Sequence, residues 1–142
     1  MTTLPITALP IITLSTLDHE RLQLLLDKLP KPWPPEAALL EAELERADIV
    51  EPTQIAPNRV TMNSKVRFRI LDSGEEHELV LSYPRDCASA NDRVSVLAPI
   101  GCALLGLAVG QRIQWPLRDG RNTQLEILAL SYQPERSGDL HR

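Results

Sequence analysis

The chain has 142 residues and a formal net charge of −4, and 43% of its residues are hydrophobic and 24% are charged. This balance is typical of a folded globular protein and excludes an intrinsically disordered chain. The length allows one domain, or one domain with a small appendage. The sequence also argues against a protein that stacks single-stranded nucleic acid on aromatic rings, because its aromatic residues are only Trp33, Phe68, Tyr83, Trp115 and Tyr132.

The amino-terminal residues do not resemble a targeting signal. The first ten residues contain no Lys or Arg and are interrupted by Pro5 and Pro10, which argues against secretion. No uninterrupted apolar run in the sequence approaches the ~18 residues of a membrane-spanning helix. Cys87 and Cys102 are too few for a disulfide scaffold and lack the spacing of a metal-binding pair. We therefore expect a cytoplasmic protein with reduced thiols and no contact with membranes.

The first predicted elements are two short helices. Ser15 or Thr16 can cap the first helix, and leucines then recur at helical spacing as far as Pro30. The proline-rich run 29–35 cannot continue a helix, because proline lacks a backbone donor and restricts the residue before it. A second amphipathic helix is predicted from residue 36 to about residue 48. The two helices together form an antiparallel hairpin.

After a connector bounded by Pro52 and Pro57, the apolar period changes from helical to two. Residues 60–70 and 76–83 are predicted as strands, joined by the turn signal Asp72-Ser-Gly74. The remaining predicted elements are a strand, a short apolar helix and a closing hairpin, at residues 93–97, 99–106, and 111–117 with 123–132. The polar tail that begins at Pro134 is expected to fray.

These elements predict an α+β fold with a short N-terminal antiparallel helical hairpin, followed by an antiparallel sheet of about five strands and one short helix. The charges support two units, because residues 1–52 hold four Lys or Arg and nine Asp or Glu, whereas residues 53–142 hold eleven and ten. We place the boundary at the connector, with the hairpin at residues 1–51 and the sheet domain at residues 52–142.

The sequence contains no Walker A loop, GxGxxG, GxSxG or HExxH motif. His19, His77 and His141 have no metal-binding spacing, and among them we expect only His77, on the apolar face of its strand, to be packed. Cys102 lies in an apolar helix and is interpreted as a buried hydrophobe, and no residue near Cys87 is placed to act as its base. We therefore predict a non-enzyme with no catalytic residue, no metal and no cofactor.

A basic row lies on the polar face of the first predicted strand, at Lys65, Arg67 and Arg69. Such a row could face nucleic acid or an acidic partner. We favour a structural interpretation, in which Glu76 and Glu78 of the next strand pair with it, because opposite charges across strands stabilise a hairpin.

The segment Val94-Ser-Val-Leu-Ala-Pro-Ile-Gly-Cys-Ala-Leu-Leu-Gly-Leu-Ala-Val-Gly110 resembles the SPxGxALLGxxxGD motif in the carboxyl-terminal domain of the Gre transcript-cleavage factors. The likeness extends from about Val60 to Tyr132. The short hairpin, the strand at 60–66 and the closing Tyr132-Gln-Pro134 are most similar to the Rnk branch, the regulators of nucleoside diphosphate kinase. Two motif positions differ, because Ala98 stands where the motif has Ser and Gln111 where it has Asp.

This resemblance implies an FKBP-like carboxyl-terminal domain that docks on bacterial RNA polymerase near its secondary channel, with the hairpin pointing toward that channel. Gre factors present acidic residues at the tip of a long hairpin, which hold a metal ion and activate water for RNA cleavage. Here the tip between Asp27 and Glu36 contains Lys28 and Lys31 and no acidic residue. An arm of about thirteen residues is also only ~20 Å long. We therefore expect competition with Gre-type factors without transcript cleavage.

The resemblance also implies which residues contact the polymerase. The expected docking residues are Ser95, Leu97, Ala98, Pro99 and Ile100. Strand alternation places Leu97 on the face opposite the core, although the hairpin or the helix after it could instead cover this side chain. The residues expected to lie toward the channel are Lys28, Lys31 and Trp33. For Trp33 the sequence leaves two alternatives open, an interface anchor or an indole that packs back on the domain.

Two other functions stay open as alternatives. One is an FKBP-like prolyl isomerase, which needs an aromatic-lined pocket that few aromatic residues are present to build, and fold alone does not carry function. The other is residual Gre-like cleavage, which the basic tip disfavours. We expect no direct sequence-specific DNA binding, and we leave open an indirect link to nucleoside diphosphate kinase.

Overall fold

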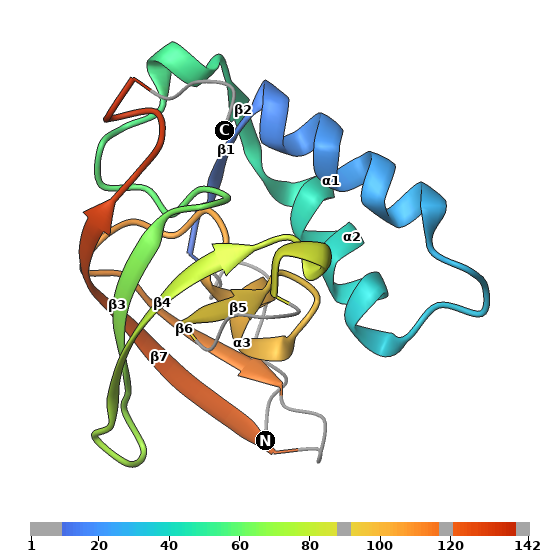
Figure 1. Cartoon of the computed structure of the whole chain (residues 1–142). Coiled ribbons are helices and arrows are strands. Elements are labelled where there is room, and N and C mark those ends of the chain that lie inside the picture. Colours follow the sequence, from blue (N-terminus) through green and yellow to red (C-terminus); the bar gives the residue numbers. More distant parts are fainter. Residues whose placement is uncertain (1–9, 88–91, 117–120, 139–142) are drawn as a thin grey trace.

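The computed structural model describes residues 10–87, 92–116 and 121–138, and Figure 1 shows how their elements are arranged. The helices in these ranges are α1 (Thr16–Lys28), α2 (Pro35–Arg46) and α3 (Pro99–Leu104), with the short 3-10 helices η2 (Pro52–Gln54) and η3 (Pro84–Cys87). The strands are β1 (Thr13–Ser15), β2 (Asp48–Val50), β3 (Lys65–Ile70), β4 (Glu76–Ser82), β5 (Arg93–Ser95), β6 (Arg112–Pro116) and β7 (Asn122–Tyr132). None of the described helices has the length and apolar character that a membrane span requires.

The helical hairpin forms where the sequence predicts it. Ser15 caps α1, because its hydroxyl accepts the N–H of Asp18 at 3.0 Å. α1 ends just before the proline-rich run, and Pro35 takes the first position of α2, where a missing N–H has no intrahelical partner to lose. α2 ends at Arg46 rather than near residue 48, because Asp48 begins β2.

A parallel pair of short strands, β1 and β2, gathers the two ends of the hairpin at its base (Figure 1). Thr13 lies opposite Asp48 and Ser15 lies opposite Val50. Three residues are too few to show an apolar period, and the sequence therefore does not predict this pair. Because β1 precedes α1 and β2 follows α2, this pair holds the two ends of the hairpin side by side.

The large sheet has the strand order β5-β4-β3-β7-β6 in the described part of the chain. β3 pairs antiparallel with β4 and with β7, and β6 pairs antiparallel with β7, as predicted. β5 instead runs parallel to β4, so the expectation of an entirely antiparallel sheet is wrong at this edge. A parallel neighbour cannot be reached by a tight turn, and ten residues separate the end of β4 at Ser82 from the start of β5 at Arg93.

The strand predicted at residues 60–70 is shorter in the structure. Only its second half is β3, and residues 60–64 form a turn in which Asn63 has a positive φ of 67°. Val60 and Met62 are nevertheless buried. Thr61 between them is also fully buried, so the apolar alternation of the sequence is not the period of an extended strand here.

One continuous hydrophobic core joins the hairpin to the large sheet. It includes Leu22, Leu26 and Leu40 of the hairpin together with Phe68 and Leu125 of the sheet. α2 also packs against α3, and Figure 1 shows the hairpin lying along one side of the sheet domain. The mixed helix and sheet architecture is thus the one predicted. The division between residues 51 and 52 stays a prediction.

Candidate protein-binding site

The predicted docking residues form the corner between β5 and α3. β5 ends at Ser95, whose hydroxyl accepts the N–H of Leu97 at 3.1 Å and whose carbonyl accepts the N–H of Ala98 at 3.0 Å. Ala98 is the N-cap of α3, and Pro99 occupies its first turn. The corner is therefore a hydrogen-bonded turn, and the strand predicted to continue to residue 97 stops before it.

Gly101 determines how closely α3 approaches this corner. A Cβ atom at this position would lie 1.9 Å from the carbonyl oxygen of Ser95, which is far inside any van der Waals contact. The motif glycine is thus required by packing between the helix and the strand end. It holds the docking residues in one arrangement.

All five predicted docking residues are half-buried. Leu97 and Ile100 both pack partly against the hydrophobic core. The prediction that Leu97 lies on the face opposite the core is wrong, because β5 ends at Ser95 and the alternation does not continue through the turn. What a partner could contact at this corner is the part of these two side chains that the core leaves exposed.

The hairpin tip combines exposed lysines with a packed indole. Lys28 ends α1 and is exposed, and Lys31 is exposed with its Nζ 5.4 Å from the centre of the Trp33 ring. Trp33 itself is half-buried and packs against the hydrophobic core. Of the two alternatives that the sequence left open, the structure favours the indole that packs back on the domain.

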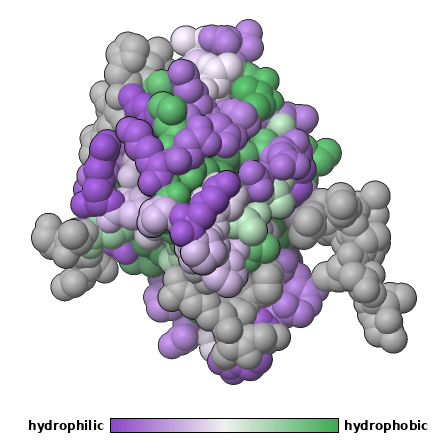
Figure 2. Space-filling model, turned by 90° about the vertical axis from the view of Figure 1, so that its right-hand side faces the viewer, coloured by the Kyte–Doolittle hydropathy of each residue, from purple (hydrophilic) through white to green (hydrophobic). Residues whose placement is uncertain are grey.

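The corner and the tip belong to different elements of the fold. In the described ranges, no hydrogen bond, ion pair or ring contact joins the five corner residues to Lys28, Lys31 or Trp33. Figure 2 shows the side of the molecule that carries the hairpin, where hydrophilic residues predominate and hydrophobic residues are visible between them. The predicted docking residues and the predicted tip residues therefore lie on different elements, and among the described residues no polar contact links the two groups.

The basic row on β3 is paired, with the predicted partners on β4 for Lys65 and Arg67 but with Glu126 of β7 for Arg69. Arg67 contacts Glu76 at 2.8 Å and Arg69 contacts Glu126 at 2.9 Å, while the Lys65 ammonium lies 3.9 Å from a Glu78 oxygen. The hydrogen bond from Arg69 lowers the pKa of the Glu126 carboxyl, so this group stays ionised near neutral pH. The row is part of a mixed ladder of charges, which does not favour nucleic-acid binding.

The histidines and cysteines do not form a reactive cluster. His77 is exposed, and its ring centre lies 5.6 Å from that of Phe68, so the expectation that it is packed is wrong. His19 is half-buried in α1, and His141 lies outside the described residues. Burial raises the pKa of the Cys102 thiol and of the Cys87 thiol. Among the described residues, no group of three potential metal ligands gathers.

Sequence reasoning missed a buried carboxyl at the base of the hairpin. Asp18 is 2% exposed, and its Oδ2 accepts the N–H of Met62 at 3.1 Å. Burial raises the pKa of Asp18 to about 7, with a further raising effect from Glu135, while the Met62 hydrogen bond and Arg21 lower it. An acidic residue in the first turn of a helix usually indicates a dipole interaction in solvent. Here the same residue links the hairpin to the loop before β3.

A second missed residue, Gln133, organises the segment after β7. Its fully buried amide donates to the carbonyls of Ala56 and Arg59 at 2.8 and 2.7 Å, and its Oε1 accepts the N–H of Arg136 at 3.0 Å. Glu135 accepts a hydrogen bond of 2.8 Å from the Thr61 hydroxyl. The expectation that the tail frays from residue 134 is therefore wrong as far as residue 138, because these bonds tie it to residues 56–61.

Comparison with known proteins identifies the family. The family model described as "Transcription elongation factor, GreA/GreB, C-term" matches residues 55–132, and the model described as "Rnk N-terminus" matches residues 10–50. The chain belongs to the Rnk family of Gre-type factors. The corner, with its Pro99 and Gly101, lies within the part that Rnk proteins share with GreA and GreB.

Individual relatives cover most of the chain. It is 45% identical over 130 residues to the regulator of nucleoside diphosphate kinase of Escherichia coli K12, a match that covers 92% of this chain and 96% of that Rnk protein. It is 32% identical over 94 residues to the transcription elongation factor GreA of Thermodesulfovibrio yellowstonii, covering 66% of this chain and 59% of that protein. A solved structure described as "Prokaryotic transcription elongation factor GreA/GreB from Nitrosomonas europaea" superimposes with a TM-score of 0.68 at 47% identity, covering 87% of this chain and 99% of that chain.

Proposed function

We propose that the chain is a non-enzymatic regulator that binds RNA polymerase near its secondary channel and competes there with Gre-type factors. The observation that carries this proposal is the match of residues 55–132 to the GreA/GreB carboxyl-terminal domain, together with a hairpin tip that lacks acidic residues. The corner from Ser95 to Ile100 provides the docking surface, and the hairpin tip lies toward the channel. Such a partner would place the protein in the cytoplasm.

The tip supports binding without transcript cleavage. Metal-assisted hydrolysis needs carboxylates that hold the ion and position the water. Residues 28–35 contain Lys28 and Lys31 but no Asp or Glu. α1 has 13 residues, so the hairpin extends by only ~20 Å at 1.5 Å per residue. Both the chemistry and the reach of the hairpin therefore oppose a role in cleavage.

The test is a binding assay with purified core RNA polymerase and a Gre factor as competitor. We expect the chain to displace the Gre factor, and we expect Leu97→Asp to lose this ability because it places a charge in an apolar contact. Ile49→Asp is the matched control, since Ile49 is an exposed apolar residue on β2 rather than at the corner. Equal binding by the folded Leu97→Asp and Ile49→Asp proteins would contradict the docking assignment.

Cleavage is tested separately with stalled, backtracked elongation complexes and Mg²⁺. We expect no release of short 3′ fragments above the level produced by the polymerase alone. A clear stimulation of fragment release would show that the tip does not need its own carboxylates, and the non-enzymatic assignment would then be abandoned.

We further propose that any effect on nucleoside diphosphate kinase is indirect and acts through transcription. The purified kinase should therefore keep its activity when the chain is added in excess. No observation favours a prolyl isomerase as a second function. Phe68 and Trp115 are 1% and 4% exposed, so these rings belong to the core and do not line an open pocket for a proline peptide.

A further inference from the structure

The N-terminal segment Pro10–Ser15 lies between the helical hairpin and the sheet domain and is bonded to both. On the hairpin side, the N–H of Asp48 donates to the carbonyl of Ile12 at 3.0 Å, as β1 and β2 pair. On the sheet-domain side, the N–H of Thr13 donates to the carbonyl of Gly106 at 3.2 Å. The segment is thus hydrogen-bonded to both units and connects the hairpin to the sheet domain.

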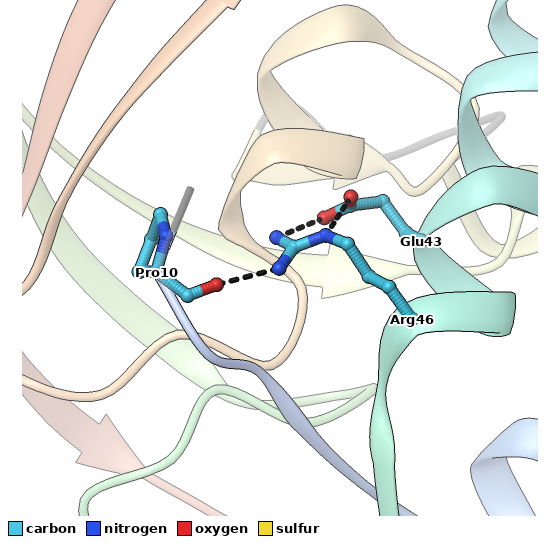
Figure 3. A network of polar contacts seen from close by, with 3 residues as sticks. All are labelled: Pro10, Glu43 and Arg46. Carbon is cyan, nitrogen blue, oxygen red and sulfur yellow. Dashed lines mark hydrogen bonds and ion pairs between the residues drawn. The ribbon is translucent and has the colours of Figure 1, made fainter. Parts of the chain in front are cut away.

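An arginine of the hairpin is hydrogen-bonded to the beginning of this segment (Figure 3). Arg46, in the last turn of α2, donates from Nη1 to the carbonyl oxygen of Pro10 at 2.6 Å. Its Nε and Nη2 donate to the two carboxylate oxygens of Glu43 at 2.6 and 3.1 Å. A bidentate contact with a buried carboxylate fixes the plane of the guanidinium. The remaining edge of the guanidinium is therefore aimed at Pro10.

An arginine of the sheet domain donates a hydrogen bond to the next carbonyl along the segment, that of Ile11. Arg59, in the loop before β3, donates from Nη1 to the carbonyl oxygen of Ile11 at 2.9 Å and to that of Gly106 at 3.0 Å. One guanidinium nitrogen thus bridges the N-terminal segment and the turn after α3. The consecutive carbonyls of Pro10 and Ile11 thus accept hydrogen bonds from an arginine of the hairpin, Arg46, and from an arginine of the sheet domain, Arg59.

The segment has no room to slide against the sheet domain. Ile12 is fully buried, and a Cβ atom on Gly106 would lie 2.7 Å from the Cβ of Ile12. Gly106 also has a positive φ of 79°, a conformation that L residues rarely adopt. Close packing therefore sets the position of the segment, and the two arginines set its attachment to each unit.

We infer that Arg46 and Arg59 are positioning residues that, through the carbonyls of Pro10 and Ile11, act together with the shared hydrophobic core to fix the direction of the helical hairpin relative to the sheet domain. The importance of this direction for polymerase binding rests on the proposed function. A rotation of about 10° at the base would move the tip of a ~20 Å arm by about 3 Å. A hairpin that must enter a channel while the corner stays docked cannot absorb such a displacement without losing contacts.

The experiment measures the direction of the hairpin by itself. Nitroxide labels are attached to unnatural amino acids at Asp27, at the end of α1, and at Ser73, in the turn between β3 and β4, which are both exposed. Double electron–electron resonance should give one narrow distance distribution for the otherwise unchanged protein. The Arg46→Lys/Arg59→Gln protein should give a several-fold broader distribution. Lysine keeps a cation beside Glu43, but its single nitrogen does not span Glu43 and Pro10 as the guanidinium does.

Arg67→Gln is the matched control, because it removes an arginine from an exposed pair on the outer face of the sheet, and it should leave the distance distribution unchanged. Amide exchange in β3 and β7 at the unmodified rate shows that the sheet domain is folded in each variant. A narrow distribution with an unchanged centre in the folded double variant would overturn the inference. If the double variant unfolds, Arg59→Gln alone decides by the same measurement, since it keeps the Glu43–Arg46 pair.

A second experiment tests whether the direction of the hairpin affects binding to RNA polymerase. In the competition assay, the double variant should bind RNA polymerase several-fold more weakly than Arg67→Gln, because only part of its hairpin population points correctly. Equal binding by the two would show that the corner alone supplies the affinity, and the link between direction and binding would be lost. Failure of the unmodified chain to bind polymerase would instead contradict the proposed function, while the distance measurement would still decide the positioning role.

Discussion

Charged side chains are arranged differently on the outer face of the large sheet and at the base of the hairpin. On the outer face, Arg67 and Glu76 form an ion pair of 2.8 Å whose side chains are 55% and 39% exposed. At the base of the hairpin, Arg46 and Glu43 form an ion pair of 2.6 Å whose side chains are 20% and 3% exposed. The distances are nearly equal, so burial decides how strongly each pair affects stability.

The difference shows which surface of the molecule tolerates substitution. Water and salt screen the charges on the outer face, so either partner of an exposed pair can be lost with little effect. At the base of the hairpin, a group that loses its partner has neither solvent nor a counter-charge to replace it. Glu43 pairs there with Arg46 of the same helix, while Asp18 accepts from Met62 and Gln133 donates to Ala56, contacts that join segments 44 and 77 positions apart in the sequence.

The largest expected effect follows from Arg46→Met, which removes the charge and keeps much of the side-chain length. It leaves the buried Glu43 carboxylate unpaired, and the free energy of unfolding at neutral pH should fall by about 3–5 kcal/mol. Urea unfolding measures this loss. The double variant Glu43→Gln/Arg46→Met removes both charges and should recover a large part of it. A loss no greater than that caused by Arg67→Met would mean that burial does not distinguish the two regions.

The next effect is a dependence of stability on pH at Asp18. Its folded pKa of about 7 lies above the ordinary value of 3.8, so between these pH values the folded chain holds a proton that the unfolded chain has released. The contribution of this group to the free energy of unfolding is therefore greatest below about pH 4 and falls as pH rises toward 7, by a few kcal/mol in all.

Asp18→Asn should remove this slope, because an amide oxygen can still accept the Met62 N–H but does not ionise. Thermal unfolding at a series of pH values from 4 to 8 measures the slope for each protein. Asp27→Asn provides the control, since Asp27 is exposed near the end of α1 and should leave the slope unchanged. If the pH dependence of stability persists in Asp18→Asn, a titratable group other than Asp18 is responsible for it.

A smaller loss is expected from Gln133→Leu. It leaves the carbonyls of Ala56 and Arg59 without their buried donor, which should cost about 1–3 kcal/mol. The matched control is Gln124→Leu, because Gln124 is an exposed amide on β7. Urea unfolding of the two variants compares them directly. Similar unfolding midpoints would show that the buried Gln133 amide contributes no more to stability than the exposed Gln124 amide, which would contradict the proposed role of burial.

The sequence predicts the elements of this fold well, because local chemistry decides them. Ser15 caps α1, Pro35 begins α2, and alternating residues mark β4 and β7. It does not predict β1 and β2, which are too short for a period, or the parallel direction of β5, which depends on how the chain crosses over. The errors thus lie where long-range pairing overrides local pattern.

The candidate site is predicted less completely than the elements. The corner from Ser95 to Ile100 follows from the motif, but the reason for Gly101 is a contact with the Ser95 carbonyl that only the folded chain shows. The contacts of Arg46 with Pro10 and of Arg59 with Ile11 join residues 36 and 48 positions apart. A single sequence carries no signal for such contacts, because any arginine can donate to any carbonyl that folding brings near it.

The smallest expected effect comes from the outer face and completes the contrast. Arg67→Gln removes one partner of the pair with Glu76 on a surface where water solvates the remaining carboxylate. The unfolding midpoint should change less than in the variants of Arg46, Asp18 or Gln133. Whatever shift occurs should disappear in about 1 M NaCl, since exposed charges are screened over a few Å at that ionic strength. The shift caused by Arg46→Met should persist in the same salt, because counter-ions do not reach the buried Glu43. Equal salt sensitivity in the two variants would place both pairs in the same dielectric environment and remove the distinction between the two regions.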